Sequence, residues 1–469
     1  MRPKFEAQRE FEFPTSNLKL TREYYAKYEA ISKILDTNAE IVDLAHRDLR
    51  HALIAPNRSR PGRARFTTEH VLRLLIVQSL EGLSLRQTVV RVDDSPALRQ
   101  FVRLGTKPMM DFTTLDKLKN ALRPATWKKI HRALARYAVS ENQITGDRLR
   151  LDTTAVETNI HWPTDSTLLW DTYRVLARLI ERAREVDADV VGTGRLHSRR
   201  AKREALAITR AAAQKGRRAR SLKRPYQRLI RRVEEILSWA AGVAHGLVDG
   251  IESQRYGAWA HTQTEALLEE LAHFHALGVR VVDQARRRVV HGESVPNDEK
   301  LFSVFEPHTE LLIRGKAGKS VEFGHMIQIQ QVEEKFITDY EVYEHKPVEH
   351  ALIDLSLIRH RELFGSDPSE LTADKGYYKN RETIRALEKR IEVVSIAKKG
   401  PRTPEETERE RDPLFRHAQA FRAGVEGSIS FLKRMLRLAR CFNRGWEHFA
   451  ATVGQTVFAH NLLVLARGS

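Results

Sequence analysis

Hydrophobic and polar positions recur with two different periods along this 469-residue chain. Residues 1–145 follow the three-to-four-residue spacing of amphipathic helices. Within them, "FTTEHVLRLLIVQSLEGLSLRQTVVRV" predicts a helix, a break at "EGLS" and a second helix; Thr67 or Thr68 is expected to cap the first helix and Ser84 the second. Such a pair is typical of a helix-turn-helix DNA reader, although any helical hairpin gives the same pattern.

The period changes to two further along the chain. Residues 146–160 alternate apolar and polar positions, which predicts a half-buried strand with Asp152 in its middle. From residue 309, "TELLIR", "VEFGHMIQIQQV" and "KFITDYEVYE" predict three strands of a meander. A helix at 347–364, a strand "ELTAD", a helix "RETIRALEKR" and a strand "IEVVSIA" follow. The polar stretch "KKGPRTPEETERERDP" predicts a loop, and residues 414–469 predict helix again.

The stretch between the first strand and the meander is helical and strongly basic. Between Arg195 and Arg232 the chain carries 15 Lys or Arg and a single acid, Glu204. Basic faces on helices suit the phosphate backbone of DNA, and the alternative interpretation is a solvated charged arm. We favour contact with DNA.

Without this insertion, the elements run strand, meander, helix, strand, helix, strand, helix, which is the order of the RNase H-like fold. The expected fold class is therefore an α/β RNase H-like core with a mixed sheet, an all-α N-terminal DNA-binding region and a basic helical insertion. The predicted domains are residues 1–125 for the N-terminal region, 126–163 with 295–469 for the catalytic domain, and 164–294 for the insertion.

Composition and charge narrow the function classes. The net charge is +18, from 79 Lys and Arg against 61 Asp and Glu, which favours a polyanionic partner such as nucleic acid. No run of 18 apolar residues predicts a membrane span, and "MRPKFEAQREFEF" is too charged for a secretory signal. The single cysteine, Cys441, excludes an internal disulfide and a Cys-based zinc site. We expect a cytoplasmic, nucleoid-associated protein.

Three carboxylates fall in elements that such a fold would bring together. Asp152 lies in the first strand, Asp374 ends the strand in "LTADKGYY", and Glu426 lies in the helical stretch "FRAGVEGSISFLKRMLRLAR". Taken alone, Asp374 reads equally well as a turn-forming residue, and Glu426 as the partner of Arg422 one turn earlier. Taken together, they favour a site for a hard divalent cation, because carboxylate oxygens are the ligands that Mg²⁺ and Mn²⁺ prefer.

The last helix adds a positively charged face beside Glu426. At about 100° per residue, the cationic positions around Glu426 fall within a stripe of roughly 60° on one helix. These positions are Arg422, Lys433, Arg437 and Arg440. Two poor helix formers, Gly424 and Gly427, lie beside the glutamate, and we expect them to let a DNA backbone approach closely.

These residues carry a resemblance to a known family. "LRLDTTAVETNIHWPTD" around Asp152, "LTADKGYY" around Asp374, and the R-x3-E-x6-K spacing in the last helix resemble the DDE-type insertion-sequence transposases, with "GKSVEFGHMIQI" similar to the meander of the ISNCY-like branch. The family usually has a tyrosine three residues before the arginine, where this chain has Gln419. The resemblance spans roughly residues 65–465.

The resemblance implies a catalytic and metal-binding triad of Asp152, Asp374 and Glu426 that holds two Mg²⁺ or Mn²⁺ ions. It implies that the chain binds terminal inverted repeats and target DNA as a homo-oligomer, cuts DNA with water and joins the freed 3′-hydroxyl to the target. The expected DNA-contacting residues are Arg422, Lys433, Arg437, Arg440, Arg199, Arg200, Lys202, Arg203, Arg217, Arg218 and Arg220. The alternatives are a nuclease or resolvase that cuts without joining, and a non-catalytic DNA-binding regulator derived from a transposase.

Overall fold

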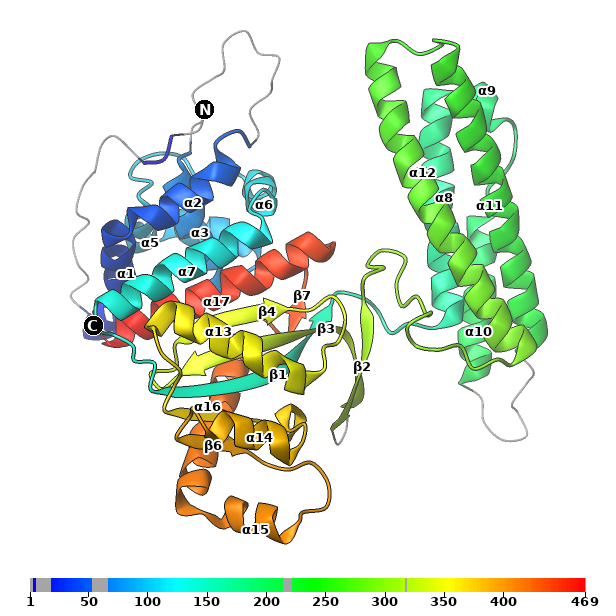
Figure 1. Ribbon diagram of the computed structural model, residues 1–469. Helices are drawn as coiled ribbons and strands as arrows, with labels where there is room; N and C mark the ends of the chain where they lie inside the picture. Colours follow the sequence, from blue (N-terminus) through cyan, green and yellow to red (C-terminus); the bar gives the residue numbers. More distant parts are fainter. Residues whose placement is uncertain (1–2, 6–17, 53–65, 214–221, 317–318, 469) are drawn as a thin grey trace. The chain divides into compact units, whose positions relative to one another are not determined.

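The structure is a computed structural model that describes residues 3–5, 18–52, 66–213, 222–316 and 319–468. The chain forms two compact units, which are described separately. Unit 1 comprises Met1–Asn159 and Gly324–Ser469, and unit 2 comprises Ile160–Phe323. Figure 1 shows the helices and the sheet of unit 1 and the long helices of unit 2. Packing therefore divides the chain in two, and the three-part functional division stays a prediction.

The N-terminal part of unit 1 is helical, as expected. Its helices are α1 (Lys19–Thr37), α2 (Ala39–Leu49), α3 (Thr68–Leu80), α4 (Leu85–Asp94), α5 (Pro96–Val102), α6 (Phe112–Asn120) and α7 (Pro124–Ser140). The break at "EGLS" separates α3 from α4, and the capping residues are Thr67 and Ser84, each with its side-chain oxygen accepting from a backbone N–H three residues later. Helix α3 is buried on nearly all sides, whereas α4 buries only Thr88 and Val92. Of this helical pair, only α4 is therefore free to present a face.

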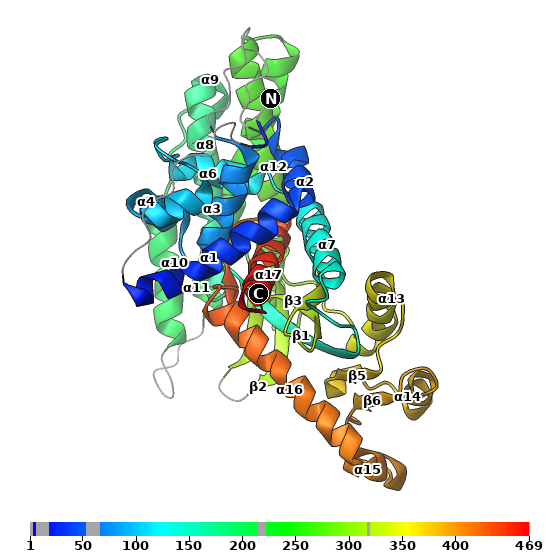
Figure 2. The ribbon, with the colours of Figure 1, turned by 90° about the vertical axis from the view of Figure 1, so that its left-hand side faces the viewer.

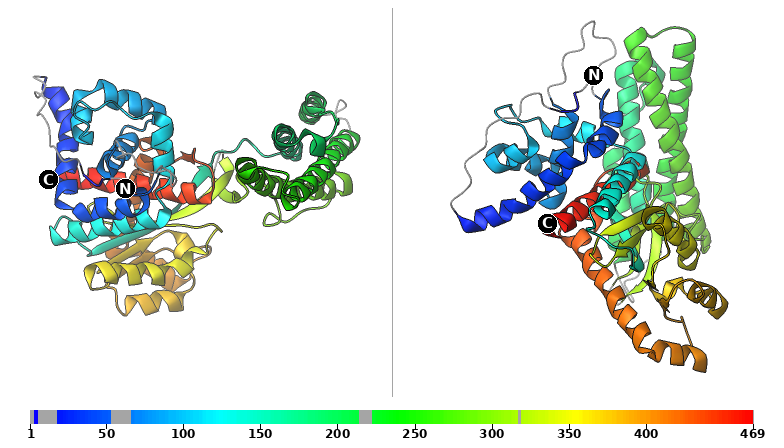
Figure 3. Two further views of the ribbon diagram at one scale, coloured as in Figure 1. Left: turned by 90° about the horizontal axis from the view of Figure 1, so that it is seen from above. Right: turned by 60° about the vertical axis from the view of Figure 1, so that its left-hand side comes forward.

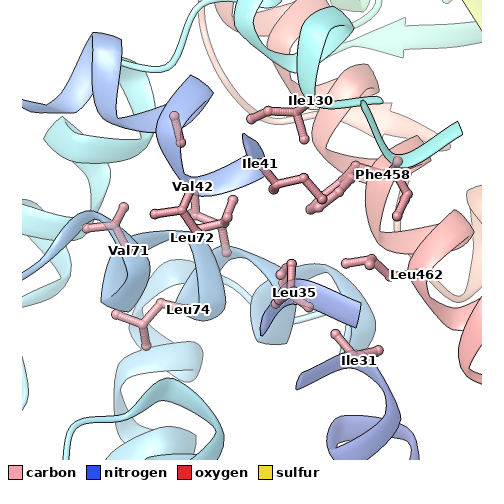
Figure 4. Close-up of a cluster of buried hydrophobic side chains, with 14 of the residues drawn as sticks. Ile31, Leu35, Ile41, Val42, Val71, Leu72, Leu74, Ile130, Phe458 and Leu462 are labelled. Carbon is pink, nitrogen blue, oxygen red and sulfur yellow. The ribbon is translucent and has the colours of Figure 1, made fainter. Parts of the chain in front are cut away.

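The long C-terminal helix α17 (Trp446–Gly468) joins the N-terminal helices to the sheet. It packs against α1, α3 and α7 on one side and against β4 (Ile337–Val342) on the other (Figure 3). Figure 4 shows Phe458 and Leu462 of α17 among side chains of the N-terminal helices such as Ile31, Ile41 and Ile130. By length and composition α17 could cross a membrane, but 83% of its apolar window is buried inside the protein, as in the core helix of a folded domain.

Among the described residues, seven strands form one mixed sheet with β1 (Arg148–Thr158) at its centre. The order is β2-β3-β1-β5-β6, with β4 also pairing β3 and β7 pairing β1. β3 runs antiparallel to β1, whereas β5 and β6 are parallel to it. The other strands are β2 (Glu310–Lys316), β3 (Lys319–Val332), β5 (Glu370–Ala373), β6 (Val393–Ile396) and β7 (Arg440–Cys441). The predicted strands are all present.

Helices cover both faces of this sheet. Helix α13 (Ile353–Phe364), with the 3-10 turn η3 (Glu349–Leu352) before it, and α14 (Arg381–Glu388) pack on the face that carries Leu149 and Leu151. Helix α16 (Pro413–Arg434) packs on the opposite face (Figure 2). The interpretation of β1 as half-buried was therefore wrong: eight of its eleven residues are buried, because neither face is left to solvent.

One predicted loop is partly helical. Within "KKGPRTPEETERERDP", residues Pro404–Arg411 form helix α15, capped by the Thr403 hydroxyl and begun by a proline at its first turn. Its segment has almost no apolar residues, so it shows no helical period. It is held by charge instead: Glu406 is buried and contacts Arg409 at 2.8 Å.

Unit 2 contains the helical insertion. Its main helices are α8 (Asp165–Val186), α9 (Ala188–Val191), α10 (Ser198–Ala212), α11 (Lys223–Glu252) and α12 (Ala258–Ala285), followed by a π-helical turn, Arg286–His291. Helices α8, α11 and α12 are long and lie beside one another (Figure 1). Their facing sides supply an apolar core of their own, including Leu176, Val233 and Leu271. The insertion is thus a folded helical unit.

Helix α16 is attached to the sheet by a buried cation, Arg150 of β1. Its Nη1 donates to the carbonyl of Phe421 at 2.7 Å, its Nε donates to Gln331 at 2.9 Å, and its guanidinium lies over the Phe421 ring. Burial lowers the pKa of Arg150 to about 10. A β-carbon at Gly424 would collide with this guanidinium, so glycine is needed there for Arg150 to reach the helix.

This contact predicts opposite effects for the two glycines of α16. Gly424→Ala should lower the free energy of unfolding by about 1 kcal/mol, because the displaced arginine loses a charge-assisted hydrogen bond that outweighs the gain in helix propensity. In an Arg150→Ala background the same change should become neutral or stabilising. Gly427→Ala, which meets no atom within 4 Å, should stabilise by roughly 0.5–1 kcal/mol in both backgrounds. Urea unfolding of both glycine variants and their parents, with and without Arg150→Ala, measures the coupling, and purely additive effects of Gly424→Ala and Arg150→Ala would contradict the contact.

Candidate active site

Two of the three predicted carboxylates come from neighbouring parallel strands. β1 and β5 pair in register with Leu151 opposite Ala373, and the next residue along each strand is an aspartate, Asp152 and Asp374. The two strands run in the same direction, so both aspartates lie at the same point along the sheet. The structure therefore brings Asp152 and Asp374 together.

Asp152 is the more buried of the two, with 13% of its side chain exposed. Its Oδ1 accepts a hydrogen bond from the backbone N–H of Thr153 at 2.7 Å. Burial raises the pKa of the Asp152 carboxyl to about 6, and the negative charges of Asp374 and Glu349 add to the rise. The Thr153 N–H and the Arg422 guanidinium act in the opposite direction without cancelling it. This carboxylate is costly to ionise without a nearby cation.

Asp374 is the turn-forming residue that one interpretation of the sequence predicted; its role as a metal ligand stays a prediction. It is the N-cap of a short 3-10 turn, Lys375–Tyr377, and its Oδ1 accepts from the Gly376 N–H at 3.4 Å. It therefore forms the turn that ends β5, and its exposed carboxylate remains available to a ligand.

Glu426 lies on α16, with 69% of its side chain exposed. The guanidinium of Arg422 stands between it and Asp152, 3.5 Å from the Glu426 carboxylate and 3.8 Å from that of Asp152. Over the described part of the chain, no group of three or more His, Cys, Asp or Glu side chains lies close enough to hold a metal ion. Arg422 supplies the positive charge between Asp152 and Glu426.

A fourth carboxylate, Glu349, was missed by the sequence analysis. It begins the turn before α13, accepts a hydrogen bond from the Thr153 hydroxyl, and lies so close to Gly376 that a β-carbon there would collide with it. It thus links the strand that carries Asp152 to the turn that carries Asp374. The only local signal was an acid in the first turn of a helix after "KP", a common feature of helices with no special role.

The prediction that four cations form one stripe on the last helix was wrong in part. Helix α16 ends at Arg434, so Arg437 and Arg440 lie beyond it and do not share its face. Arg440 is in β7 and its Nη2 contacts Glu157 at 2.7 Å. Lys433 is in the last turn of α16, two turns after Glu426. The space beside Gly424 is filled by the Arg150 guanidinium, so the expectation that Gly424 lets a DNA backbone approach was also wrong.

The basic residues of the insertion are partly described. On α10, the cations lie opposite a buried face of Ala201, Ala205 and Ile208. The exposed cations of that helix are the predicted contacts Arg199, Arg200, Lys202 and Arg203, together with Arg210. Three further predicted contacts, Arg217, Arg218 and Arg220, lie outside the described residues. Gln419, in the place of the family's tyrosine, donates its amide to the carbonyl of Ser395 at 2.7 Å and so ties α16 to β6.

Comparison with known families bears on the N-terminal helices. Residues 23–121 match the family model described as "Transposase domain (DUF772)". This match supports a transposase family. The matched residues run from α1 through α6 and include the pair α3 and α4. No curated protein and no solved structure matches the chain. The match indicates a transposase role and leaves the chemistry to the carboxylates described above.

The raised pKa of Asp152 predicts a pH-dependent gain in stability from a neutral substitute. Protonated Asp152 contributes stability below about pH 4, and this contribution is lost as the pH rises through its folded pKa of about 6. In chelator at pH 8, Asp152→Asn should therefore have a free energy of unfolding roughly 2–3 kcal/mol above that of the unmodified protein, and unfold at a higher temperature. Near pH 4 the two proteins should unfold at the same temperature. Glu426→Gln, at an exposed carboxylate, is the control and should change little at either pH. Equal midpoints for Asp152→Asn and the unmodified protein at pH 8 would contradict the proposed cost.

Proposed function

We propose that this protein is a DDE-type DNA transposase with an RNase H-like catalytic core. The observation that carries the proposal is the pair of aspartates at adjacent positions of two parallel strands, with a glutamate on the helix that crosses the same sheet. The sheet order β2-β3-β1-β5-β6, with β1 antiparallel to β3 and parallel to β5, supports the core assignment. The transposase domain matched at residues 23–121 supports the transposase part of this proposal.

The residues that would hold divalent cations are Asp152, Asp374 and Glu426. These carboxylates supply the hard oxygen ligands that Mg²⁺ and Mn²⁺ prefer, and the charge of Asp374 adds to the rise that burial causes in the pKa of Asp152. Two such ions, when bound, activate the attacking oxygen and stabilise the leaving oxygen of a phosphodiester. No cysteine or histidine is needed in this set, in keeping with an oxygen-preferring metal.

The remaining residues of the site orient these carboxylates and bind DNA. The Thr153 N–H holds one oxygen of Asp152, which leaves the other oxygen to a ligand. Glu349 fixes the distance between β1 and the Asp374 turn through Thr153 and Gly376. Arg422 pairs weakly with two carboxylates and is the residue placed to exchange them for a DNA phosphate. Lys433, on the same helix, is proposed as a second phosphate contact.

Sequence recognition is assigned to α4, and non-specific affinity to α10. Helix α4 is mostly exposed and carries Arg86 and Arg91, so it can present side chains to base edges. Helix α10 presents a cationic face opposite its buried side, which suits contact with phosphates. Oligomers are expected on the DNA, where both element ends are handled together.

The triad predicts loss of chemistry with retention of binding. Asp152→Ala, Asp374→Ala and Glu426→Ala should each reduce Mg²⁺-dependent cleavage of the element's ends by at least about a thousandfold, yet bind the same DNA within about twofold, because a lost metal ligand affects the reaction far more than phosphate contact. Cleavage and joining are scored on labelled oligonucleotides, and binding by mobility shift. The exposed acid Glu408 of α15 is the matched control as Glu408→Ala, which should cleave normally. Near-normal cleavage by any triad variant would show that the substituted residue does not belong to the triad. Cleavage without joining by the unmodified protein would favour the nuclease alternative.

The cationic face of α10 predicts a specific change in salt dependence. Removing Arg199 and Arg203 together, both as Arg→Gln, should weaken binding to any duplex and reduce the slope of log affinity against log salt by about two. Arg182→Gln is the control, because that guanidinium is already paired with Glu270 at 2.7 Å in the same unit. Binding is measured by fluorescence anisotropy from about 50 to 300 mM salt. An unchanged slope in the double variant would mean that α10 does not contact the phosphates.

A further inference from the structure

A pocket in unit 1, with both polar and apolar walls, contains none of the three candidate carboxylates and has no assigned role. It has a volume of about 460 Å³ and lies between the α3–α4 turn, helices α6 and α17, and the segment that follows α16. The walls that matter are formed by Gln78, Lys119, Arg437, Phe442, Asn443 and Gln455. The pocket thus touches both the transposase-type domain and the end of the helix that carries Glu426.

Arg437, at the mouth of this pocket, has an unusual backbone. Its φ is +61°, a left-handed conformation in which glycine or asparagine is usual, and it follows directly on the wide turn that ends α16. The aliphatic part of its side chain lies against Gly82 of the α3–α4 turn. No ion pair or hydrogen bond engages its guanidinium within the described residues, and the side chain is exposed. An exposed arginine at a strained backbone position, without a partner in the described residues, is suited to a ligand of negative charge.

The inner wall offers a donor and an acceptor side by side. The amide nitrogen of Gln455 donates to the Leu75 carbonyl, to Gln78 Oε1 and to the Ser79 hydroxyl, at 2.9 to 3.2 Å. This leaves Gln455 Oε1 as an acceptor and the Gln78 amide nitrogen as a donor, neither with a partner among the described residues. The two residues are only 5% and 9% exposed. Amide groups with unused hydrogen-bonding capacity in a pocket wall match the edge of a planar polar ligand.

Two further side chains specify the kind of ligand. Phe442, in the pocket wall, is 65% exposed although it is a large aromatic residue. Lys119 is a second basic side chain in the wall, with its Nζ 3.4 Å from Gln78 Oε1 and the acid Asp116 on the same helix; burial lowers the pKa of Lys119, so Arg437 is the main positive charge. An aromatic face, an amide pair and cations together fit a base with its phosphate, whereas a phosphate alone would leave most of the volume unfilled.

We propose that this pocket holds one unpaired nucleotide of the bound DNA, with its base against Phe442 and the Gln78–Gln455 amides and its phosphate at Arg437. The proposal rests on the proposed function, because it takes DNA as the substrate. The N-cap of α4, Ser84, also lines the pocket, so the nucleotide is held where the candidate reading helix begins. Extrusion of a base from the duplex there releases the strand for the carboxylates on the neighbouring sheet.

The test uses the full chain and three duplexes that differ at one position. One duplex is fully paired, the second carries a single unpaired 2-aminopurine, and the third carries an abasic site at the same unpaired position. We expect the unmodified protein to bind the second duplex roughly tenfold more tightly than the other two, because base–aromatic stacking is lost in both. Phe442→Ala should abolish this preference and leave affinity for the paired duplex within about twofold. Trp259→Ala, at an exposed aromatic residue of unit 2, is the control and should retain the preference.

A second variant separates binding from folding. Arg437→Gly should weaken binding to the two duplexes with an unpaired position and lower their salt slope by about one, and should leave affinity for the paired duplex within about twofold. Its thermal midpoint should stay equal or rise, because glycine accepts a positive φ. A fall in the midpoint would make Arg437 a structural residue and overturn its phosphate contact. Equal affinity of the unmodified protein for the three duplexes would overturn the pocket assignment even if the protein cuts DNA with Mg²⁺. No binding to any duplex would overturn the proposed function as well.

Discussion

The arrangement of the candidate site depends on a single buried guanidinium, that of Arg150. It lies between the central strand and α16, where it donates to a helix carbonyl, to Gln331 and to no carboxylate within the described residues. A buried cation without an acid partner is costly, and the Phe421 ring and the carbonyl offset this cost only if the helix stays in one position. Because Arg422, Gly424 and Glu426 belong to the same helix, their positions follow from this contact.

The electrostatics of the site follow a related rule. Asp374 and Glu349, which come from other parts of the chain, lie near Asp152, and their charges add to the cost that burial imposes on ionising it. Arg422 relieves part of this repulsion at distances too long for strong hydrogen bonds, 3.5 and 3.8 Å. The fold therefore holds like charges close together in this site, at a cost in free energy. Such an arrangement is common where a protein binds an ion or a charged substrate.

Much of this could be read from the sequence, because it depends on local periodicity. The strands and long helices follow apolar spacing, and the pairing of Asp152 with Asp374 follows from both lying in strands that run parallel. Three features could not be read. Helix α15 lacks apolar residues, the end of α16 has no glycine at residue 437 to mark it, and Glu349 meets Thr153 across 196 residues of sequence. The contact of Glu349 is long-range and leaves no local pattern, whereas the start of α15 and the end of α16 are local features that apolar spacing does not mark.

The position of α17 has a consequence for how such a protein can evolve. Its side chains complete the apolar core of the N-terminal helices, and its other side packs on the sheet that carries the two aspartates. The transposase-type domain at 23–121 and that sheet are thus joined through one shared interior. Exchange of this domain between related chains would expose one side of α17 and require matching changes about 400 residues away in sequence. Changes in DNA preference are therefore expected to accumulate at exposed positions such as those of α4, and not by shuffling whole domains.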